Sequence, residues 1–333
     1  MEEVIRLENV KKYYDVRSGL LGSKILKALD GVTLSIWKKE TMAVVGESGC
    51  GKSTLGRVSL RLLDLTSGRI LFKGQDISKM KEDELREKSF RKKMQIIFQD
   101  PYSSLNPFMR IGDIVAEPLE IHGYHREEIK ETVYRALEDV KLVPPEEFVN
   151  RYPHELSGGQ RQRVNIARAL VLGPEYIVAD EPVSMIDASS RAEILLLLKS
   201  IRDSREMGVL YITHDIATAR YVAERIAVMY LGEIAETGLT PSVLKTPIHP
   251  YTIMLLNSVP EPDPANRRRR RLAIKGEPPS PLNPPSGCKF HTRCPVAIER
   301  CRTEKPALIE YMPRHFVACH RAEEIMRGTT SVA

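Results

Sequence analysis

One segment restricts the possible folds more than any other part of the sequence. Residues 46–54 read Gly-Glu-Ser-Gly-Cys-Gly-Lys-Ser-Thr and match the pattern G-x-x-x-x-G-K-[ST]. The apolar run 41–45 precedes this segment, and we expect a helix to begin around Lys52. Glycines let backbone N–H groups turn inward around phosphate groups, and a helix N-terminus attracts anions. The segment therefore predicts an α/β domain that binds a nucleotide.

Each position of this loop has an expected role. Lys52 should reach the β and γ phosphates, and Ser53 should place its hydroxyl on Mg²⁺. The other loop residues should surround the phosphates, and they are Gly46, Glu47, Ser48, Gly49, Cys50, Gly51 and Thr54. We interpret Cys50 as a small spacer, although neighbouring groups could depress its thiol pKa enough for modification to block the loop.

The first 246 residues alternate between strand-like and helix-like segments, as α/β domains do. Strands are expected over 3–9, 32–36, 41–45, 176–179 and 209–213. The region 106–143 should be mainly helical, because 127–141 repeats apolar residues at helical spacing, and another helix is expected over 192–202. Composition is ordinary for a folded protein, with 42% apolar and 28% charged residues.

The last 87 residues differ from the rest in composition. They hold 14 Lys and Arg against 8 Asp and Glu, so they carry the whole formal charge of +6. They also hold 13 of the 22 prolines and four of the five cysteines. Since 333 residues correspond to roughly two domains, we expect one domain over 1–246 and a second over 247–333. No run approaches the roughly 18 apolar residues of a membrane span, and the start has no apolar signal region, which predicts a cytoplasmic chain.

A second expected strand ends in two carboxylates. The apolar run Tyr176-Ile-Val-Ala is followed directly by Asp180 and Glu181. Asp180 would hold Mg²⁺ directly or through water, and Glu181 would orient and activate an attacking water. Two adjacent acids could instead form a solvated turn, but the phosphate loop in the same chain favours the catalytic interpretation.

A third motif resembles one family specifically. Leu-Ser-Gly-Gly-Gln-Arg-Gln-Arg, with Ser157, Gly158, Gly159 and Gln160, matches the signature of ATP-binding cassette (ABC) ATPases. The rest of that family's pattern follows in order, with Gln99 in Ile-Ile-Phe-Gln-Asp, Asp187 in Ser-Met-Ile-Asp and His214 in Tyr-Ile-Thr-His-Asp. Ser-Met-Ile-Asp stands where Ser-Ala-Leu-Asp is usual, which leaves Asp187 intact.

The resemblance implies a RecA-like P-loop α/β nucleotide-binding domain with an antiparallel β subdomain, a helical subdomain at about 101–165, and a small cysteine-containing C-terminal domain. It implies an ATP hydrolase with Glu181, His214, Gln99 and Lys52 as catalytic residues. Gln99 would join Ser53 and Asp180 at Mg²⁺, and Tyr14 would stack on adenine, although neighbouring Tyr13 could do so instead. Two chains would clasp two ATP molecules, with residues 157–160 of one chain facing nucleotide on the other, and Asp187 would also contribute to nucleotide binding.

The C-terminal part resembles the ATPase subunits of oligopeptide and dipeptide ABC importers. The resemblance rests on Ile248-His-Pro-Tyr-Thr, the loop 276–281 and Cys288-Lys-Phe-His-Thr-Arg-Cys-Pro, and an insertion at 17–27 is similar to that of F-type subunits. It implies a peripheral subunit on the cytoplasmic face of the membrane. Its partners would be a second homologous ATPase in a heterodimer, two transmembrane permeases and, indirectly, a solute-binding protein, with no nucleic acid. Because the family also imports nickel and short sugars, the solute stays open between peptides, oligosaccharides and nickel.

Four cysteines of the C-terminal part suggest a metal site. Cys288, Cys294, Cys301 and Cys319 offer four soft sulfur donors, which suit iron–sulfur or zinc. Zinc sites usually contain a tight Cys-x₂₋₄-Cys pair, which is absent, and the resemblance implies a [4Fe-4S] cluster. We therefore expect that cluster. Zinc, unlinked buried cysteines and, in a reducing compartment less favourably, disulfides remain open alternatives.

Other functions compete with transport. An ABC-fold ATPase could act on DNA or ribosomes, but such proteins carry inserted coiled coils, zinc modules or two cassettes, and here only 105 residues separate Lys52 from Ser157. A regulatory subunit that does not hydrolyse ATP is disfavoured by Glu181 and His214. The five arginines at 267–271 are interpreted first as a solvated run, then as a contact for lipid headgroups, and last as a nucleic-acid contact.

Overall fold

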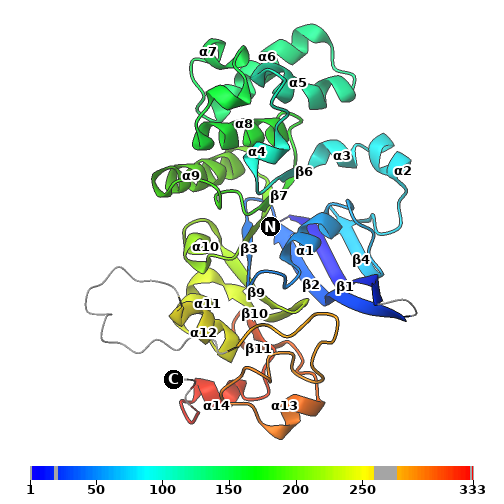
Figure 1. Ribbon diagram of the computed structural model, residues 1–333, viewed down its shortest axis with the longest axis vertical. Helices are drawn as coiled ribbons and strands as arrows, with labels where there is room; N and C mark the ends of the chain where they lie inside the picture. Colours follow the sequence, from blue (N-terminus) through cyan, green and yellow to red (C-terminus); the bar gives the residue numbers. More distant parts are fainter. Residues whose placement is uncertain (1, 19–21, 259–275, 331, 333) are drawn as a thin grey trace. The chain divides into compact units, whose positions relative to one another are not determined.

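The computed structural model describes residues 2–18, 22–258, 276–330 and 332. These residues form two compact units (Figure 1). One, here called the helical unit, comprises Met1–Ile5, Ser35–Thr41 and Phe72–Tyr211. The other, here called the phosphate-loop unit, comprises Arg6–Leu34, Met42–Leu71 and Ile212–Ala333.

The helical unit is built on two parallel strands covered by helices. Strand β6 (Met94–Ile97) pairs with β7 (Tyr176–Asp180), with Met94 opposite Tyr176, and all five residues of β7 are buried. Helix α8 (Gly158–Leu170) packs against α5, α6 and α9, which lie close to it in Figure 1. The other elements are β5 (Gln75–Asp76), α2 (Glu82–Glu87), α3 (Phe90–Lys93), α4 (Pro101–Ser104), α5 (Ile111–Ile121), α6 (Arg126–Asp139), α7 (Glu146–Val149), a 3₁₀ turn (Pro153–Glu155), α9 (Ala188–Arg205) and most of β8 (Gly208–Thr213).

Apolar spacing explains the expected helix over 127–141, which is present as α6 (Arg126–Asp139). Its buried residues Ile129, Val133, Ala136 and Leu137 recur three to four positions apart, so they line one face of the helix. The expected helix over 192–202 is also present, but α9 begins earlier because Asp187 caps it.

The phosphate-loop unit contains a mixed sheet in the order β11-β12-β10-β9-β3. Strand β3 runs parallel to β9, and β9, β10, β12 and β11 pair antiparallel in turn. A second group of strands has the order β2-β1-β4. The bounds are β1 (Glu3–Ser18), β2 (Gly22–Trp37), β3 (Thr41–Val45), α1 (Lys52–Ser59), β4 (Ser67–Phe72), α10 (Ile216–Val222), β9 (Arg225–Tyr230), β10 (Glu233–Leu239), α11 (Thr240–Lys245), α12 (Pro250–Asn257), α13 (Glu299–Thr303), β11 (Ile309–Met312), β12 (His315–Val317) and α14 (Ala322–Met326).

Residues after 246 complete this unit. Strand β12 pairs with β10, with Val317 opposite Glu236, and β11 pairs with β12. The C-terminal part thereby adds two strands to the edge of the sheet. Val317 also joins Ile248 and Ala322 in a small buried apolar cluster. The C-terminal part is therefore packed onto β10, which pairs with β9, the strand beside β3.

Candidate functional site

The phosphate loop connects β3 to α1, and close approach to other backbone fixes two of its glycines. Gly46 has φ +156° and Gly51 has φ +107°. A Cβ atom on Gly46 would lie 2.2 Å from the Met229 carbonyl oxygen, and one on Gly51 would lie 2.3 Å from the Ala28 carbonyl oxygen. Both distances are far below van der Waals contact. Glycine is therefore required at these two positions.

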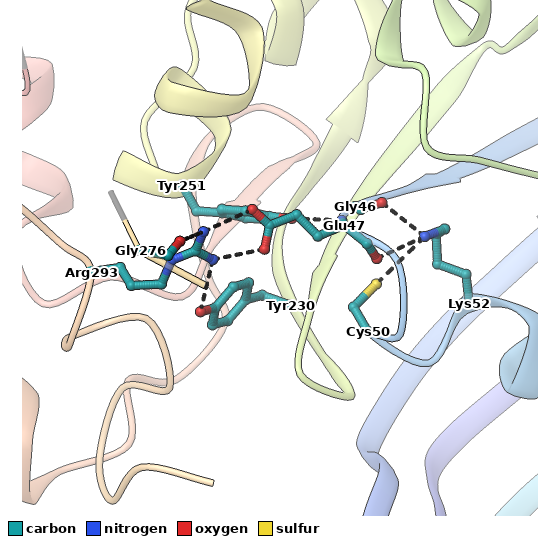
Figure 2. A network of polar contacts seen from close by, with 8 residues as sticks. All are labelled: Gly46, Glu47, Cys50, Lys52, Tyr230, Tyr251, Gly276 and Arg293. Carbon is teal, nitrogen blue, oxygen red and sulfur yellow. Dashed lines mark hydrogen bonds and ion pairs between the residues drawn. The ribbon is translucent and has the colours of Figure 1, made fainter. Parts of the chain in front are cut away.

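Lys52 begins α1, and its side chain folds back over the loop (Figure 2). Its Nζ atom donates to the carbonyl oxygens of Gly46 at 2.8 Å and Glu47 at 2.9 Å. Gly51, at the N-cap of α1, makes no side-chain capping bond, and the first turn contains no acidic residue. A buried ammonium group beside an uncapped helix N-terminus fits an anionic triphosphate ligand.

Cys50 lies inside the loop as a buried residue, as a spacer should. Burial raises the pKa of its thiol and outweighs the opposing effect of Lys52, whose Nζ lies 3.9 Å from Sγ. The expectation that neighbouring groups could depress this pKa is therefore wrong, because desolvation of the thiolate dominates. The thiol is the protonated, weakly reactive form near neutral pH.

The two neighbouring tyrosines of β1 have different surroundings. The Tyr13 hydroxyl donates to Asp30 Oδ1 at 2.5 Å, and burial together with this bond raises its pKa. The Tyr14 ring instead has the Lys12 ammonium 4.8 Å from its centroid. Tyr13 is thus tied to the neighbouring strand through its hydroxyl.

His214 lies at an exposed position between β8 and α10. The residue after it, Asp215, caps α10 by accepting the Ala217 N–H at 2.9 Å. The Asp215 N–H donates to Thr213 Oγ1 at 3.0 Å. Hydrogen bonds on both sides therefore fix the backbone that presents the imidazole.

In the helical unit, Gln99 and Glu181 lie together. Gln99 Nε2 donates to Glu181 Oε2 at 3.1 Å, which links the end of β6 to the end of β7. Glu181 has φ +46°, a conformation that costs a non-glycine residue about 1–3 kcal/mol. The N–H and Oγ of Ser184 donate to the Glu181 carbonyl oxygen at 3.2 and 3.1 Å and hold this turn. Sequence reasoning quoted Ser184 as the first residue of Ser-Met-Ile-Asp but missed its role in holding this turn.

The signature residues form the N-terminal cap of α8. Ser157 Oγ accepts the Gln160 N–H at 3.2 Å, and Gln160 Oε1 accepts the Ser157 N–H at 3.0 Å. A Cβ atom on Gly159 would lie 3.3 Å from Ser190, so α8 and α9 approach closely at their N-termini. Asp187 caps α9, and hydrogen bonds from Ser189 and Ser190 lower its pKa to about 2.

The predicted nucleotide residues are divided between the two units. The phosphate-loop unit holds Tyr14, the loop residues 46–54 and His214, and the helical unit holds Gln99, residues 157–160, Asp180, Glu181 and Asp187. Asp180 is buried at the end of β7. Its carboxylate, the Ser53 hydroxyl and the Gln99 amide oxygen are the hard oxygen donors that suit Mg²⁺.

Comparison with known proteins decides the family. A family model described as "ABC transporter" matches residues 29–184, and one described as "Oligopeptide/dipeptide transporter, C-terminal region" matches residues 235–301. The oligopeptide transport ATP-binding protein AppF of Bacillus subtilis is 49% identical over 323 residues, which cover 96% of this chain and 97% of AppF. The chain belongs to the ATP-binding proteins of ABC transporters.

Further relatives agree with this ABC ATPase assignment. YkfD of Bacillus subtilis, described as a putative oligopeptide transport ATP-binding protein, is 46% identical over 320 residues, or 95% of each chain. The cassette MJ0796, solved as a dimer in a post-hydrolysis state bound to ADP and Pi, has a TM-score of 0.62 at 33% identity and covers 71% of this chain and 98% of its own. CbiO1 of Clostridium perfringens has a TM-score of 0.64 at 27% identity and covers 74% and 92%. The predicted ABC fold and ATP hydrolase class are confirmed.

The iron–sulfur prediction for this ABC ATPase is wrong. Among the described residues, which include all four C-terminal cysteines, no group of three or more His, Cys, Asp or Glu side chains could hold a metal ion. Cys288, Cys294, Cys301 and Cys319 are free thiols. Burial raises the pKa to about 11 for Cys288 and Cys294 and to about 12 for Cys319.

Two other expectations concern the membrane. No helix within the described ranges combines the length and the apolar character that crossing a membrane would require. The five arginines at 267–271 lie outside the described residues of this ABC ATPase.

Proposed function

We propose that this ABC ATPase powers the import of peptides across a membrane. The observation that carries the proposal is the 49% identity to AppF, an oligopeptide transport ATP-binding protein, over nearly the whole length of both chains. The match to the C-terminal region of oligopeptide and dipeptide transporters at 235–301 supports the same class of solute.

In this proposal, residues 46–54 bind the triphosphate of ATP. Lys52 exchanges its hydrogen bonds to the Gly46 and Glu47 carbonyl oxygens for bonds to the β and γ phosphates. Tyr14 stacks on adenine, which is supported by the engagement of the Tyr13 hydroxyl with Asp30. Ser53, Asp180 and Gln99 would hold Mg²⁺, which would neutralise charge on the phosphates.

Glu181 accepts the proton of the attacking water in the proposed hydrolysis. The Gln99 amide and the turn at Ser184 support this role because they fix the carboxylate and the backbone of Glu181. His214 contacts the γ phosphate from its exposed position between β8 and α10. Since the strained turn at Glu181 is held by hydrogen bonds, the base is positioned before the substrate binds.

Two such cassettes close on ATP in the proposed cycle. Ser157, Gly158, Gly159 and Gln160 cap α8, and this helix N-terminus faces the γ phosphate bound to the partner, as does Asp187. The partner is a second homologous ATPase, so the working pair is a heterodimer. Closure drives the permeases from inward-facing to outward-facing, and hydrolysis resets them.

The helical unit carries a candidate surface for the permeases. Phe98, Tyr102 and Phe108 follow β6 along the chain and are exposed, Phe108 to 88%. Exposed aromatic side chains are typical of protein interfaces. We propose that two transmembrane permeases dock here, near Gln99 and on the helical subdomain at about 101–165 that follows it, and hold the subunit on the cytoplasmic face of the membrane. A solute-binding protein contributes to transport indirectly. Within this chain, the proposed cassette spans residues 1–246 and the proposed C-terminal domain spans residues 247–333.

Reconstitution tests this proposal. The chain would be assembled in proteoliposomes with the partner ATPase, permeases and solute-binding protein of this proposal, with MgATP on the ATPase side. We expect uptake of labelled oligopeptides that is abolished by Glu181→Gln. Uptake of nickel or short oligosaccharides instead would refute the peptide assignment. Recovery of DNA-bound or ribosomal proteins instead of permeases in a pull-down would refute the transport function itself.

A further inference from the structure

Arg293 of the C-terminal part binds the carboxylate of a phosphate-loop residue. Its Nη1 donates to Glu47 Oε2 at 2.7 Å and its Nη2 to Glu47 Oε1 at 3.0 Å, so the pair is bidentate (Figure 2). The Arg293 side chain is only 6% exposed. Charge-assisted bidentate pairs are among the strongest hydrogen-bonded contacts, and burial limits their screening by salt.

Glu47 is held at each of its polar groups. Its N–H donates to the Tyr251 hydroxyl at 2.9 Å, its carbonyl oxygen accepts from Lys52 at 2.9 Å, and its carboxylate binds Arg293. Arg293 also donates to the Tyr230 hydroxyl at 3.3 Å and to the Gly276 carbonyl oxygen at 2.9 Å. The second residue of the loop is therefore fixed by α12 and by the segment that carries Arg293, and β9 in turn holds Arg293 through Tyr230.

That segment is itself firmly anchored. Lys289, 8% exposed, pairs with Asp30 at 3.1 Å and Glu233 at 2.9 Å. Phe290 is buried and its ring lies 5.2 and 5.3 Å from the rings of Tyr230 and Tyr251. The Arg293 N–H donates to the Phe290 carbonyl oxygen at 3.0 Å, so the backbone that carries the guanidinium is held in a turn.

We propose that Arg293 is a positioning residue for nucleotide binding, which neutralises and orients Glu47 so that the phosphate loop accepts an anionic triphosphate. The inference rests on the proposed role of residues 46–54. An unpaired carboxylate on the loop would repel the phosphates, because two like charges at short range interact strongly where water is excluded. The C-terminal part thereby sets the ATP affinity of the cassette through one ion pair.

The test measures the equilibrium affinity of the full-length chain for MgATP by calorimetry. Arg293→Met should weaken binding about tenfold, which corresponds to about 1.4 kcal/mol. Adding Glu47→Gln to Arg293→Met should restore the affinity to within about threefold of the unmodified chain, because the unpaired charge is then removed. Arg293→Lys should give an intermediate loss, since lysine keeps the charge without the bidentate geometry. The matched control is Arg300→Met, in an exposed pair with Glu304, and it should bind like the unmodified chain.

The outcomes separate this inference from the proposed function. Lys52→Ala should abolish MgATP binding, and retention of binding would refute the assignment of the loop itself. If Lys52→Ala loses binding while Arg293→Met keeps it, the positioning role is wrong. A double variant as weak as Arg293→Met would also overturn the charge argument. In the assembled transporter, Arg293→Met should raise KM for ATP about tenfold and leave kcat within about twofold, whereas an equal fall in kcat would contradict a binding role.

Discussion

Replacing Glu236 with glutamine tests how the C-terminal part is attached to the sheet. Glu236 and His315 are both fully buried. The Glu236 carboxylate accepts the N–H groups of Ile248 and His249, each at 2.9 Å. It also lies 2.7 Å from Nε2 of His315, which must donate because a carboxylate only accepts. One side chain on β10 therefore binds both the segment before α12 and strand β12.

The expected loss follows from these three contacts. Glutamine keeps one acceptor oxygen and puts an NH₂ donor where Glu236 offers its second oxygen. One buried N–H donor then loses its partner, which costs about 1–3 kcal/mol. Removing the charge of one member of a buried pair raises the total cost to about 3–5 kcal/mol. We expect Glu236→Gln to lower the free energy of unfolding by about 3–4 kcal/mol. The corresponding fall in Tm is about 6–16 °C, at about 2–4 °C per kcal/mol for domains of about 150–250 residues.

Thermal unfolding of the full chain, followed by circular dichroism and calorimetry, measures this shift. The matched control is Glu323→Gln, because Glu323 is exposed and pairs with Arg327 at 3.2 Å. Exposed pairs contribute about 0–1 kcal/mol, so the control should change the free energy of unfolding little. A shift for Glu236→Gln no larger than that of Glu323→Gln would refute the reasoning.

Three further predictions concern the loop, the base and pH. Glu181→Gln should slow ATP turnover by about 10²- to 10⁴-fold while MgATP still binds, and an unchanged rate would exclude Glu181 as the base. Gly51→Ala should abolish MgATP binding, because its Cβ would lie 2.3 Å from a carbonyl oxygen, whereas Gly123→Ala, also at positive φ but with nothing within 4 Å, should bind normally. Burial opposes ionisation of Asp30, but hydrogen bonding from Tyr13 and the charge of Lys289 lower its pKa to about 2. Its contribution to stability should therefore be complete above its ordinary pKa near 4 and fall between pH 4 and 2. Acid denaturation of Asp30→Asn should lack this part of the pH dependence, and identical curves would contradict the assignment.

Local features of the site could be predicted from the sequence because short-range geometry determines them. The helix beginning at Lys52 and the cap at Ser157 depend on neighbours within a few residues. The glycines at 46 and 51 belong to a short motif, although the backbone that requires them, at Met229 and Ala28, is distant in sequence. The strands at 3–9 and 32–36 were expected too short, since β1 and β2 each have 16 residues. The part of β1 after residue 9 and the part of β2 before residue 32 carry charged residues and lack the alternation of apolar residues that predicts a strand. The two strands are longer than expected because they pair with each other.

Long-range contacts could not be predicted in the same way. Arg293 and Glu47 are 246 positions apart, and nothing in either local sequence names its partner. The motifs around Tyr251 and Arg293 indicated a family, but they gave no indication that both residues contact the phosphate loop. The cysteine spacing likewise indicated a donor type that suits metals, but a metal site depends on how side chains converge, and the described residues form no such group.

Ion pairs between the C-terminal part and the cassette explain the uneven distribution of charge along the sequence. The C-terminal part has an excess of basic residues. Several of these basic groups bind acidic groups of the cassette strands and loops. The pairs are Lys289 with Asp30, Lys289 and Lys305 with Glu233, and Arg293 with Glu47. Buried pairs add little net stability over apolar packing, but an incorrect partner leaves a buried charge unpaired and is costly. These pairs therefore attach the C-terminal part at one specific position on the cassette. In that position a single arginine, Arg293, controls the charge of the phosphate loop by pairing with Glu47.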